Sequence, residues 1–382
     1  MNLYAFELGR KKELSTAELI SVLGEENLLE KNLDTVIFKL KDFAPQDLQD
    51  RLGGTIKIIE IFEKLPNLDV KDKIKEHLEE NFKDSSGKIP FSISILSIKN
   101  LRQINIKDLL NYSKKILKSL GLNSRFVNKN FKNTRPSTIF KAKVIQKGID
   151  INIIQGNKEI FLGKTIAIQN INNYSKRDFD KPKRDMKVGM LPPKLSQILI
   201  NLAGNPKTIY DPFCGTGTVL MEGLLMGKDV VGSDISDRMV EYSKENTKWL
   251  KEEFNTKNSC KIFEKDARFI TKKDLPEKID AVITEGYLGQ ALESAPNQKL
   301  QETIFRELAN LHFNWLKAIS QVTPKSCKIV MCVTAFRVRN RIIHLPRFKE
   351  IAEENGYKII NTFTYDRPDQ FVARDIKILV RK

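Results

Sequence analysis

The first half of the chain mixes two patterns of apolar and polar positions. In the segment 91–96 (Phe-Ser-Ile-Ser-Ile-Leu) apolar and polar residues alternate, which predicts a strand, while 106–120 has the spacing of a helix. Two strands that turn at Lys147-Gly148 are expected within 139–154, and another within 161–168. We therefore expect an α+β region.

In the second half, short apolar segments alternate regularly with helical ones. Strands are expected at 208–211, 229–234, 261–263, 281–284 and 328–333, and helices at 195–203, 218–226, 238–251 and 300–320. Such alternation predicts a parallel sheet with helices on both faces. The closing segments 357–365 and 374–380 predict an antiparallel strand pair added to it. The fold class is therefore α/β.

Composition narrows the classes of protein. No apolar run reaches the roughly 18 residues of a membrane span, and the first residues do not resemble a signal peptide. The four cysteines form no CxxC pair, and the three histidines are scattered. A disulfide framework or a metal site is therefore not expected. We predict a cytoplasmic protein without membrane or metal.

Positive charge is concentrated in one part of the chain. The net charge is +17, and residues 101–200 alone carry +15. Such a block can be a solvated face, or it can bind a phosphate backbone, where each neutralised phosphate releases a counterion.

A glycine-containing turn follows the first strand of the second half. Residues 211–218 read Asp-Pro-Phe-Cys-Gly-Thr-Gly-Thr. Glycines let a ligand approach the backbone, and ligands of parallel sheets bind at the carboxyl ends of strands. A Walker loop is excluded because no Gly-Lys-Ser/Thr follows, and Leu220 stands where a dinucleotide fingerprint needs glycine. The turn matches the first motif of S-adenosylmethionine (SAM) methyltransferases; a plain strand-to-helix turn is the alternative.

Two later acids fit the same cofactor. Asp234 ends the next strand, where a carboxylate can accept both ribose hydroxyls, although it can also cap a helix. Asp266 follows the third strand, where the adenine amine would lie, although a lone Asp is also a common turn residue. The predicted cofactor-binding residues are Asp211, Phe213, Cys214, Gly215, Thr216, Gly217, Asp234, Ile235, Asp266 and Ala267.

The fourth strand leads into a candidate acceptor loop. Methyltransferases of exocyclic amines carry Asp/Asn-Pro-Pro-Tyr here: an acid or amide and a backbone carbonyl accept the amine's N–H bonds, and the aromatic ring stacks on the base. This chain has Thr-Glu-Gly-Tyr, with Thr at the acidic position. The alternative is an ordinary βα turn with Glu at a helix N-terminus. The predicted catalytic residues are Thr284, Glu285, Gly286 and Tyr287.

As a whole, the sequence resembles the THUMP-domain tRNA guanosine N2-methyltransferases. The similarity rests on the start of the chain, a basic linker, the methyltransferase motif and the tail, at residues 6–19, 174–195, 211–218 and 367–376. The resemblance implies a Rossmann-like SAM methyltransferase domain. It also implies a domain order: 1–60 an α+β, ferredoxin-like segment, 61–170 a THUMP RNA-binding module, 171–194 a linker, and 195–382 the methyltransferase domain.

The resemblance implies that the THUMP module docks the acceptor end of tRNA. The basic block covers that module, with Phe126 and Phe131 interleaved, although each lysine alone can be merely solvated. The candidate RNA contacts are Lys114, Lys115, Lys118, Arg125, Lys129, Lys132, Arg135, Lys141 and Lys143. Eukaryotic members of the family use a small activator subunit and archaeal ones act alone, so this partner stays open.

The expected function is SAM-dependent N2-methylation of a tRNA guanosine, of the position-ten type. The altered acceptor loop keeps a second interpretation open: a tRNA-binding THUMP protein whose methyltransferase site is inactive or changed in specificity. A third, a DNA adenine methyltransferase, fits less well because the charge lies in the THUMP-like segment.

Overall fold

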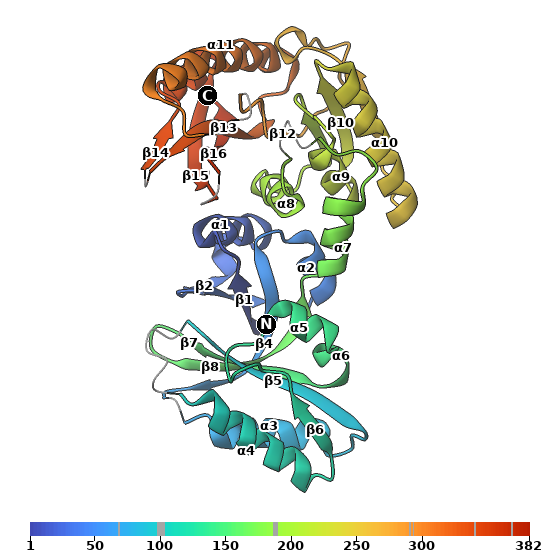
Figure 1. Cartoon of the computed structure of the whole chain (residues 1–382), viewed down its shortest axis with the longest axis vertical. Coiled ribbons are helices and arrows are strands. Elements are labelled where there is room, and N and C mark those ends of the chain that lie inside the picture. Colours follow the sequence, from blue (N-terminus) through green and yellow to red (C-terminus); the bar gives the residue numbers. More distant parts are fainter. Residues whose placement is uncertain are drawn as a thin grey trace. The chain divides into compact units, whose positions relative to one another are not determined.

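The computed structural model of the chain describes residues 1–67, 69–97, 104–185, 190–289, 292, 294–339, 341–367 and 370–382. The chain forms two compact units, Met1–Asn172 and Asn173–Lys382. Each unit has its own eight-stranded sheet (Figure 1). In the part of the chain described, no helix is long and apolar enough to cross a membrane.

The first unit begins with a β-α-β-β-α-β arrangement. Its elements are β1 (Asn2–Leu8), α1 (Lys12–Leu23), the short 3-10 helix η1 (Glu25–Asn27), β2 (Leu28–Lys31), β3 (Thr35–Leu40), α2 (Pro45–Arg51) and β4 (Thr55–Leu65). β1 pairs antiparallel with both β3 and β4, so the strand order is β2-β3-β1-β4, as in ferredoxin-like folds. The boundary expected after residue 60 falls inside β4.

The same sheet continues into the rest of the first unit. Its elements are α3 (Lys71–Phe82), β5 (Lys88–Leu96), α4 (Ile106–Ser119), β6 (Asn123–Phe126), α5 (Pro136–Lys141), α6 (Val144–Lys147), β7 (Ile149–Gln155) and β8 (Ile160–Ile168). β4 pairs with β8, and the order goes on as β8-β7-β5-β6. Leu78 of α3 and Leu117 of α4 are buried in one apolar cluster with Phe91 and Ile151 of the sheet. β4 therefore unites both parts of this unit in a single sheet.

The first of the two strands expected within 139–154 is wrong, because α5 and α6 occupy that segment. Pro136 lies in the first turn of α5, where its fixed φ suits a helix. Ile139 and Val144 are buried against Ile168. Two short helices can bury these apolar side chains as well as a strand can. Only β7 remains of the expected pair.

The second unit begins with helical segments and then alternates strands with helices. The chain enters it through α7 (Ile171–Ser175) and the π-helix η3 (Lys176–Asp180). Its further elements are α8 (Pro193–Leu202), β9 (Thr208–Asp211), α9 (Thr218–Leu225), β10 (Asp229–Asp234), α10 (Asp237–Phe254), β11 (Cys260–Glu264), the 3-10 helix η4 (Ala267–Phe269), β12 (Ala281–Thr284), α11 (Gln298–Val322), β13 (Lys328–Val338), β14 (Arg341–His344), α12 (Phe348–Glu354), β15 (Tyr357–Tyr365) and β16 (Val372–Arg381).

The sheet of the second unit has a Rossmann-like core of parallel strands. Its order is β11-β10-β9-β12-β13-β16-β15, with β14 paired to β13. β9 to β13 are parallel, and β16 is antiparallel to both β13 and β15. The core contains Trp315 of α11, Phe336 of β13 and Tyr357 of β15, all completely or almost completely buried. The predicted α/β class with its antiparallel terminal pair is confirmed.

Part of the expected linker is packed helix. The Arg177 side chain in η3 is 6% exposed, and its Nε donates a hydrogen bond of 2.7 Å to Glu222 on α9. The Glu222 side chain is completely buried, and burial raises the pKa of its carboxyl while Arg177 opposes the rise. This ion pair therefore fixes η3 to the helix that follows the glycine turn.

Candidate functional site

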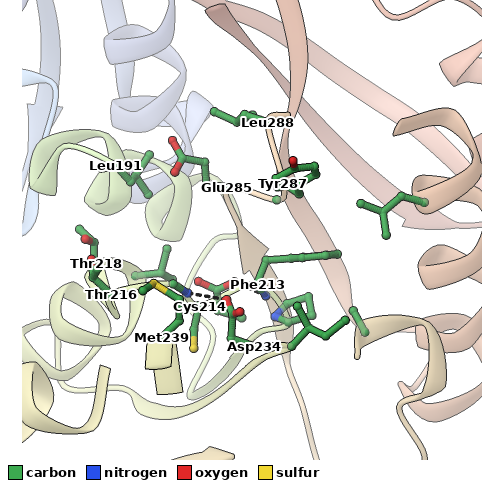
Figure 2. A pocket seen from close by; sticks show the side chains of 18 of the residues that line it. Leu191, Phe213, Cys214, Thr216, Thr218, Asp234, Met239, Glu285, Tyr287 and Leu288 are labelled. Atoms are coloured by element: carbon green, nitrogen blue, oxygen red, sulfur yellow. Dashed lines mark hydrogen bonds between the residues drawn. The ribbon is translucent and has the colours of Figure 1, made fainter. Parts of the chain in front are cut away.

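A pocket of about 500 Å³ opens in the second unit at the carboxyl ends of β9, β10 and β12 (Figure 2). It gathers every predicted cofactor residue except Gly217, and every predicted catalytic residue except Thr284. The sequence analysis missed other lining residues: Met190, Leu191, Pro212, Thr218, Val219, Met239, Arg268, Leu288, Gly289 and Leu311. Most of these are sequence neighbours of predicted residues, whereas Leu311 has no local signal.

The glycine turn holds its shape through local hydrogen bonds. The carboxylate of Asp211 accepts a bond of 3.1 Å from the Phe213 N–H, and Gly215 adopts a φ of 51°. A Cβ on Gly215 would meet no atom within 4 Å, so this backbone borders open space where a ligand can approach. Gly217 has another role: a Cβ there would lie 2.5 Å from the Ser243 Oγ, so α9 and α10 could not pack as they do.

Asp234 is tied to this turn. Its Oδ2 accepts a bond of 3.0 Å from the Gly215 N–H, and its Oδ1 accepts one of 3.0 Å from the Ser236 N–H. The residue is half-buried and lines the pocket, and burial raises the pKa of its carboxyl. Each carboxylate oxygen can accept a second bond. Asp234 therefore fits a ribose diol in the pocket.

Asp266 is held by a partner two residues away. The Arg268 guanidinium binds both oxygens of its carboxylate at 2.6–3.0 Å. The hydrogen bond from Arg268 lowers the pKa of the Asp266 carboxyl. The carboxylate is thus kept ionised as a hydrogen-bond acceptor at the pocket wall, which fits an adenine amine.

These features fit SAM. Asp211, Asp234 and Glu285 place three carboxyl groups around the pocket, beside the open space at Gly215. Exposed Ile235 offers an apolar surface next to Asp234. A ligand with a ribose, an adenine and a positive charge matches this set of donors and acceptors.

The first residue of the acceptor loop does not reach the pocket. Thr284 is completely buried at the end of β12. Its hydroxyl bonds to Asp211 and accepts a bond of 3.0 Å from the Gly286 N–H. Thr284 therefore links the glycine turn to the acceptor loop, and the next residue, Glu285, is the first with its side chain in the pocket.

A residue of β16 fixes Glu285. The Arg374 Nε donates a hydrogen bond of 2.5 Å to Glu285 Oε1, and the two side chains are 9% and 19% exposed. Burial disfavours the charge of Arg374, but the Glu285 carboxylate outweighs it and raises the pKa of the guanidinium. No bond to Oε2 is present among the described residues, so this oxygen is available to a substrate N–H. The sequence analysis missed Arg374, which lies far along the chain.

Tyr287 completes the open side of the pocket. Its side chain is 47% exposed, as expected of a surface on which a base can stack. In Figure 2, Glu285, Tyr287 and Leu288 lie on one side of the pocket, and Cys214, Asp234 and Met239 lie on the other. We call the side with Cys214, Asp234 and Met239 the cofactor side and the side with Glu285, Tyr287 and Leu288 the acceptor side, after the roles predicted for these segments.

The nine predicted RNA contacts all lie exposed in the first unit. Four of them, Lys129, Lys132, Arg135 and Lys141, line a polar cavity of about 570 Å³ formed by α5 and by the loop that joins β6 to α5. Of the interleaved aromatics, Phe126 packs edge-on against core Phe91, whereas Phe131 is 41% exposed. The nine basic residues therefore lie at the surface, and of Phe126 and Phe131 it is Phe131 that is exposed to a ligand.

Two models of known methyltransferase families match the sequence. The UPF0020 model, described as RMKL-like, methyltransferase domain, matches residues 181–357. The N6_N4_Mtase model, described as DNA methylase, matches residues 12–245, which is more than half of the chain. The fold and the pocket thus define a methyltransferase.

Curated relatives that are similar in sequence to parts of this chain are tRNA methyltransferases. The tRNA (guanine(10)-N2)-dimethyltransferase of Methanothermobacter thermautotrophicus is 37% identical over 129 residues, which is 33% of this chain and 35% of the relative. The chain belongs to the N6_N4_Mtase methylases. Over part of its length it is also similar to curated tRNA (guanine(10)-N2)-dimethyltransferases. In these matches it spans about a third of the length of the first curated relatives.

Solved structures show the same fold. TrmN from Thermus thermophilus has a TM-score of 0.56 at 12% identity, over 100% of both chains. SMU.472, solved in complex with SAH, has a TM-score of 0.50 at 12% identity, over 100% of this chain and 98% of that one.

Proposed function

We propose that the protein is a SAM-dependent tRNA methyltransferase that acts on the exocyclic N2 amine of a guanosine, of the position-ten type. One observation carries the proposal: a single pocket joins the glycine turn and Asp234 on its cofactor side to Glu285 and Tyr287 on its acceptor side. The family and the names of the relatives agree with this activity.

Asp234 would hold the ribose of SAM, Asp266 the adenine amine, and the turn at Gly215 the rest of the cofactor. Bound SAM supplies a methyl group made electrophilic by its sulfonium. The lone pair of the guanine amine is delocalised into the ring, so it must be freed before attack. Glu285 Oε2 and the Gly286 carbonyl would accept the two N–H bonds, and Tyr287 would stack on the base. Arg374 holds Glu285 in place for this task. Rate acceleration then comes from positioning and electrostatics.

The first unit would supply the RNA docking surface, with a THUMP module that binds the tRNA acceptor end. The exposed basic residues and the cavity between β6 and α5 support this role, because a polyanion needs clustered, accessible cations. A tRNA substrate also fits the cytoplasmic location predicted from the composition.

One observation favours the rival function, a tRNA-binding protein without amine methylation. The loop holds Glu285-Gly286 where related enzymes carry prolines, and Gly286 adopts a φ of 71°, which proline cannot adopt. The loop backbone therefore differs from that of a Pro-Pro loop.

The test is methyl transfer from labelled SAM to an unmodified tRNA transcript by the purified chain alone. Its control is a transcript with adenosine in place of guanosine 10. Nucleoside mass spectrometry should find N2-methylated guanosine only in the first transcript and should count the methyl groups. Binding of tRNA without methyl transfer, where a related enzyme works, would favour the rival. Methylation of duplex DNA instead would overturn the proposal. If transfer occurs only after a small activator subunit is added, the chain depends on that partner.

A further inference from the structure

A strongly basic hairpin follows the fifth parallel strand of the second unit. β13 and β14 pair antiparallel from Ala335 opposite His344 to Val338 opposite Arg341. The segment 335–349, which contains this hairpin, carries five arginine and lysine residues and no acid. Its charge lies outside the basic block of residues 101–200, and no role assigned so far uses it.

The strand register places the hairpin next to the acceptor loop. Thr284, the last residue of β12, pairs with Met331, so β13 runs on beyond the end of β12. A Cβ on Gly286 would lie 3.2 Å from the Cys332 carbonyl, so the loop rests on this extension. Arg374, which holds Glu285, pairs with Thr334. The hairpin begins with the following residue of β13.

The charges at the hairpin tip are free to bind a ligand. Arg337, nearer the base, bonds to Asp366 at 2.7 Å, but Arg339 and Arg341 are exposed and form no ion pair with any described residue. Arg339 has a φ of 56°, which Gly or Asn adopts more easily in such a turn. Turn geometry therefore does not explain an arginine at this position. Phe371, 36% exposed, binds the Arg337 N–H through its carbonyl, which adds an aromatic surface nearby.

We propose that this hairpin is a second RNA-binding surface, on which Arg339 and Arg341 bind backbone phosphates close to the nucleotide to be methylated. Guanidinium groups suit this task because their planar N–H donors can bind two phosphate oxygens at once. The inference rests on the proposed function, since that function makes RNA the substrate. It adds an anchor within the catalytic unit itself, on a hairpin whose base follows Thr334, the residue paired with Arg374.

The test compares two double variants of the full chain that remove equal charge. Arg339→Gln/Arg341→Gln removes the tip charges. Lys207→Gln/Lys325→Gln is the control, because both lysines are exposed. Lys207 directly precedes β9 and Lys325 lies shortly before β13, so both are at the opposite edge of the sheet. Binding of an unmodified tRNA transcript is measured over a range of salt concentrations, and SAM binding by calorimetry.

The arginine variant should bind tRNA about tenfold more weakly at low salt, with the slope of log affinity against log salt reduced by roughly 1.5 to 2. The control variant should change either quantity far less, and both should bind SAM like the unmodified chain. Suppose that the unmodified chain methylates tRNA. An equal loss of tRNA affinity in both variants, or no loss in the arginine variant, would then overturn the proposal of a hairpin site. If the unmodified chain neither binds nor methylates tRNA, the proposed function itself fails.

Discussion

The two sides of the pocket are built in different ways. On the cofactor side, the bonds from Asp211 to Phe213 and from Asp234 to Gly215 and Ser236 join neighbours along the chain or residues at the ends of two adjacent strands. On the acceptor side, Glu285 depends on Arg374, 89 residues further along the chain. The first side is fixed by a short motif, and the second by the way β16 inserts beside β13.

This difference separates the binding of the cofactor from the recognition of the substrate. A local turn can serve any substrate, because it only has to hold the cofactor. A loop fixed by a distant strand can change its chemistry through residues outside the loop, because Arg374 of β16 holds the carboxylate of Glu285. The Thr284 side chain bonds to both sides, since its hydroxyl contacts Asp211 and accepts a bond from the Gly286 N–H.

The largest effect is expected on the acceptor side. Glu285→Ala should lower kcat for tRNA methylation about 1000-fold, because the substrate amine loses the acceptor that frees its lone pair. SAM binding should change less than about threefold, since Glu285 forms no hydrogen bond or ion pair with the glycine turn among the described residues and is bonded to Arg374 instead. Single-turnover methylation and calorimetry measure the two quantities.

The conservative variant Glu285→Gln is the control for this result. It keeps an acceptor oxygen but loses the charge that pairs with Arg374, so its kcat should lie between those of Glu285→Ala and the unmodified chain. If Glu285→Ala keeps a third or more of the activity, Glu285 is not the acceptor. Thermal unfolding shows whether Arg374, left without its partner, disturbs the fold.

A smaller effect is expected on the cofactor side, where a substitution should weaken the binding of SAM and leave the binding of tRNA unchanged. Asp234→Ala should weaken SAM binding about 100-fold, because two hydrogen bonds to an ionised group are lost together with the support of the turn at Gly215. Binding of tRNA should be unchanged. Calorimetry with SAM and filter binding with tRNA provide the measurements.

Asp237→Ala is the matched control, since Asp237 is an exposed acid three residues further on that does not line the pocket. It should bind SAM normally. Equal losses of SAM and tRNA binding in Asp234→Ala would mean that the substitution unfolds the unit or that the ribose lies elsewhere.

The sequence predicted most residues that line the cofactor side of the pocket, but it missed Arg374, which holds the acceptor side. Both outcomes have the same physical reason. The turn 211–218 follows β9 and Asp234 ends β10, and the carboxyl ends of these adjacent parallel strands meet at one edge of the sheet. A local pattern therefore suffices to bring them together. It did not separate the roles of the two glycines: Gly215 borders the pocket, whereas Gly217 allows α10 to pack. The position of the acceptor loop was also predictable, but Arg374 was not, because strand order brings it there.

In the first unit, the basic surface could be predicted from charge alone, but its backbone could not. A run of β-branched residues at 144–154 indicates strand, yet Val144 lies in a helix because two short helices bury it against Ile139 and Ile168. Alternation of apolar residues decides between a helix and a strand only when the segment is long enough to show a period.

The smallest predicted effect concerns the junction between the two sides of the pocket. Burial raises the pKa of the completely buried Asp211 carboxyl to about 7, a rise that bonds from Thr284 and the Phe213 N–H oppose and that nearby Asp234 and Glu285 reinforce. In the unfolded chain this group titrates near its ordinary value of 3.8. Between these values the folded state holds a proton that the unfolded state has lost, so stability must fall as pH rises. The slope is about 1.4 kcal/mol of unfolding free energy per pH unit.

Asp211→Asn should remove this slope, because an amide does not titrate while its oxygen can still accept the bond from the Phe213 N–H. Both tryptophans, Trp249 and Trp315, lie in the second unit, so urea unfolding followed by tryptophan fluorescence reports on that unit alone. From pH 5.5 to 6.5, the unmodified chain should lose about 1.4 kcal/mol relative to the variant. Parallel curves for both proteins would show that Asp211 is already ionised, in which case Thr284 joins a charged carboxylate, rather than a neutral one, to the acceptor loop.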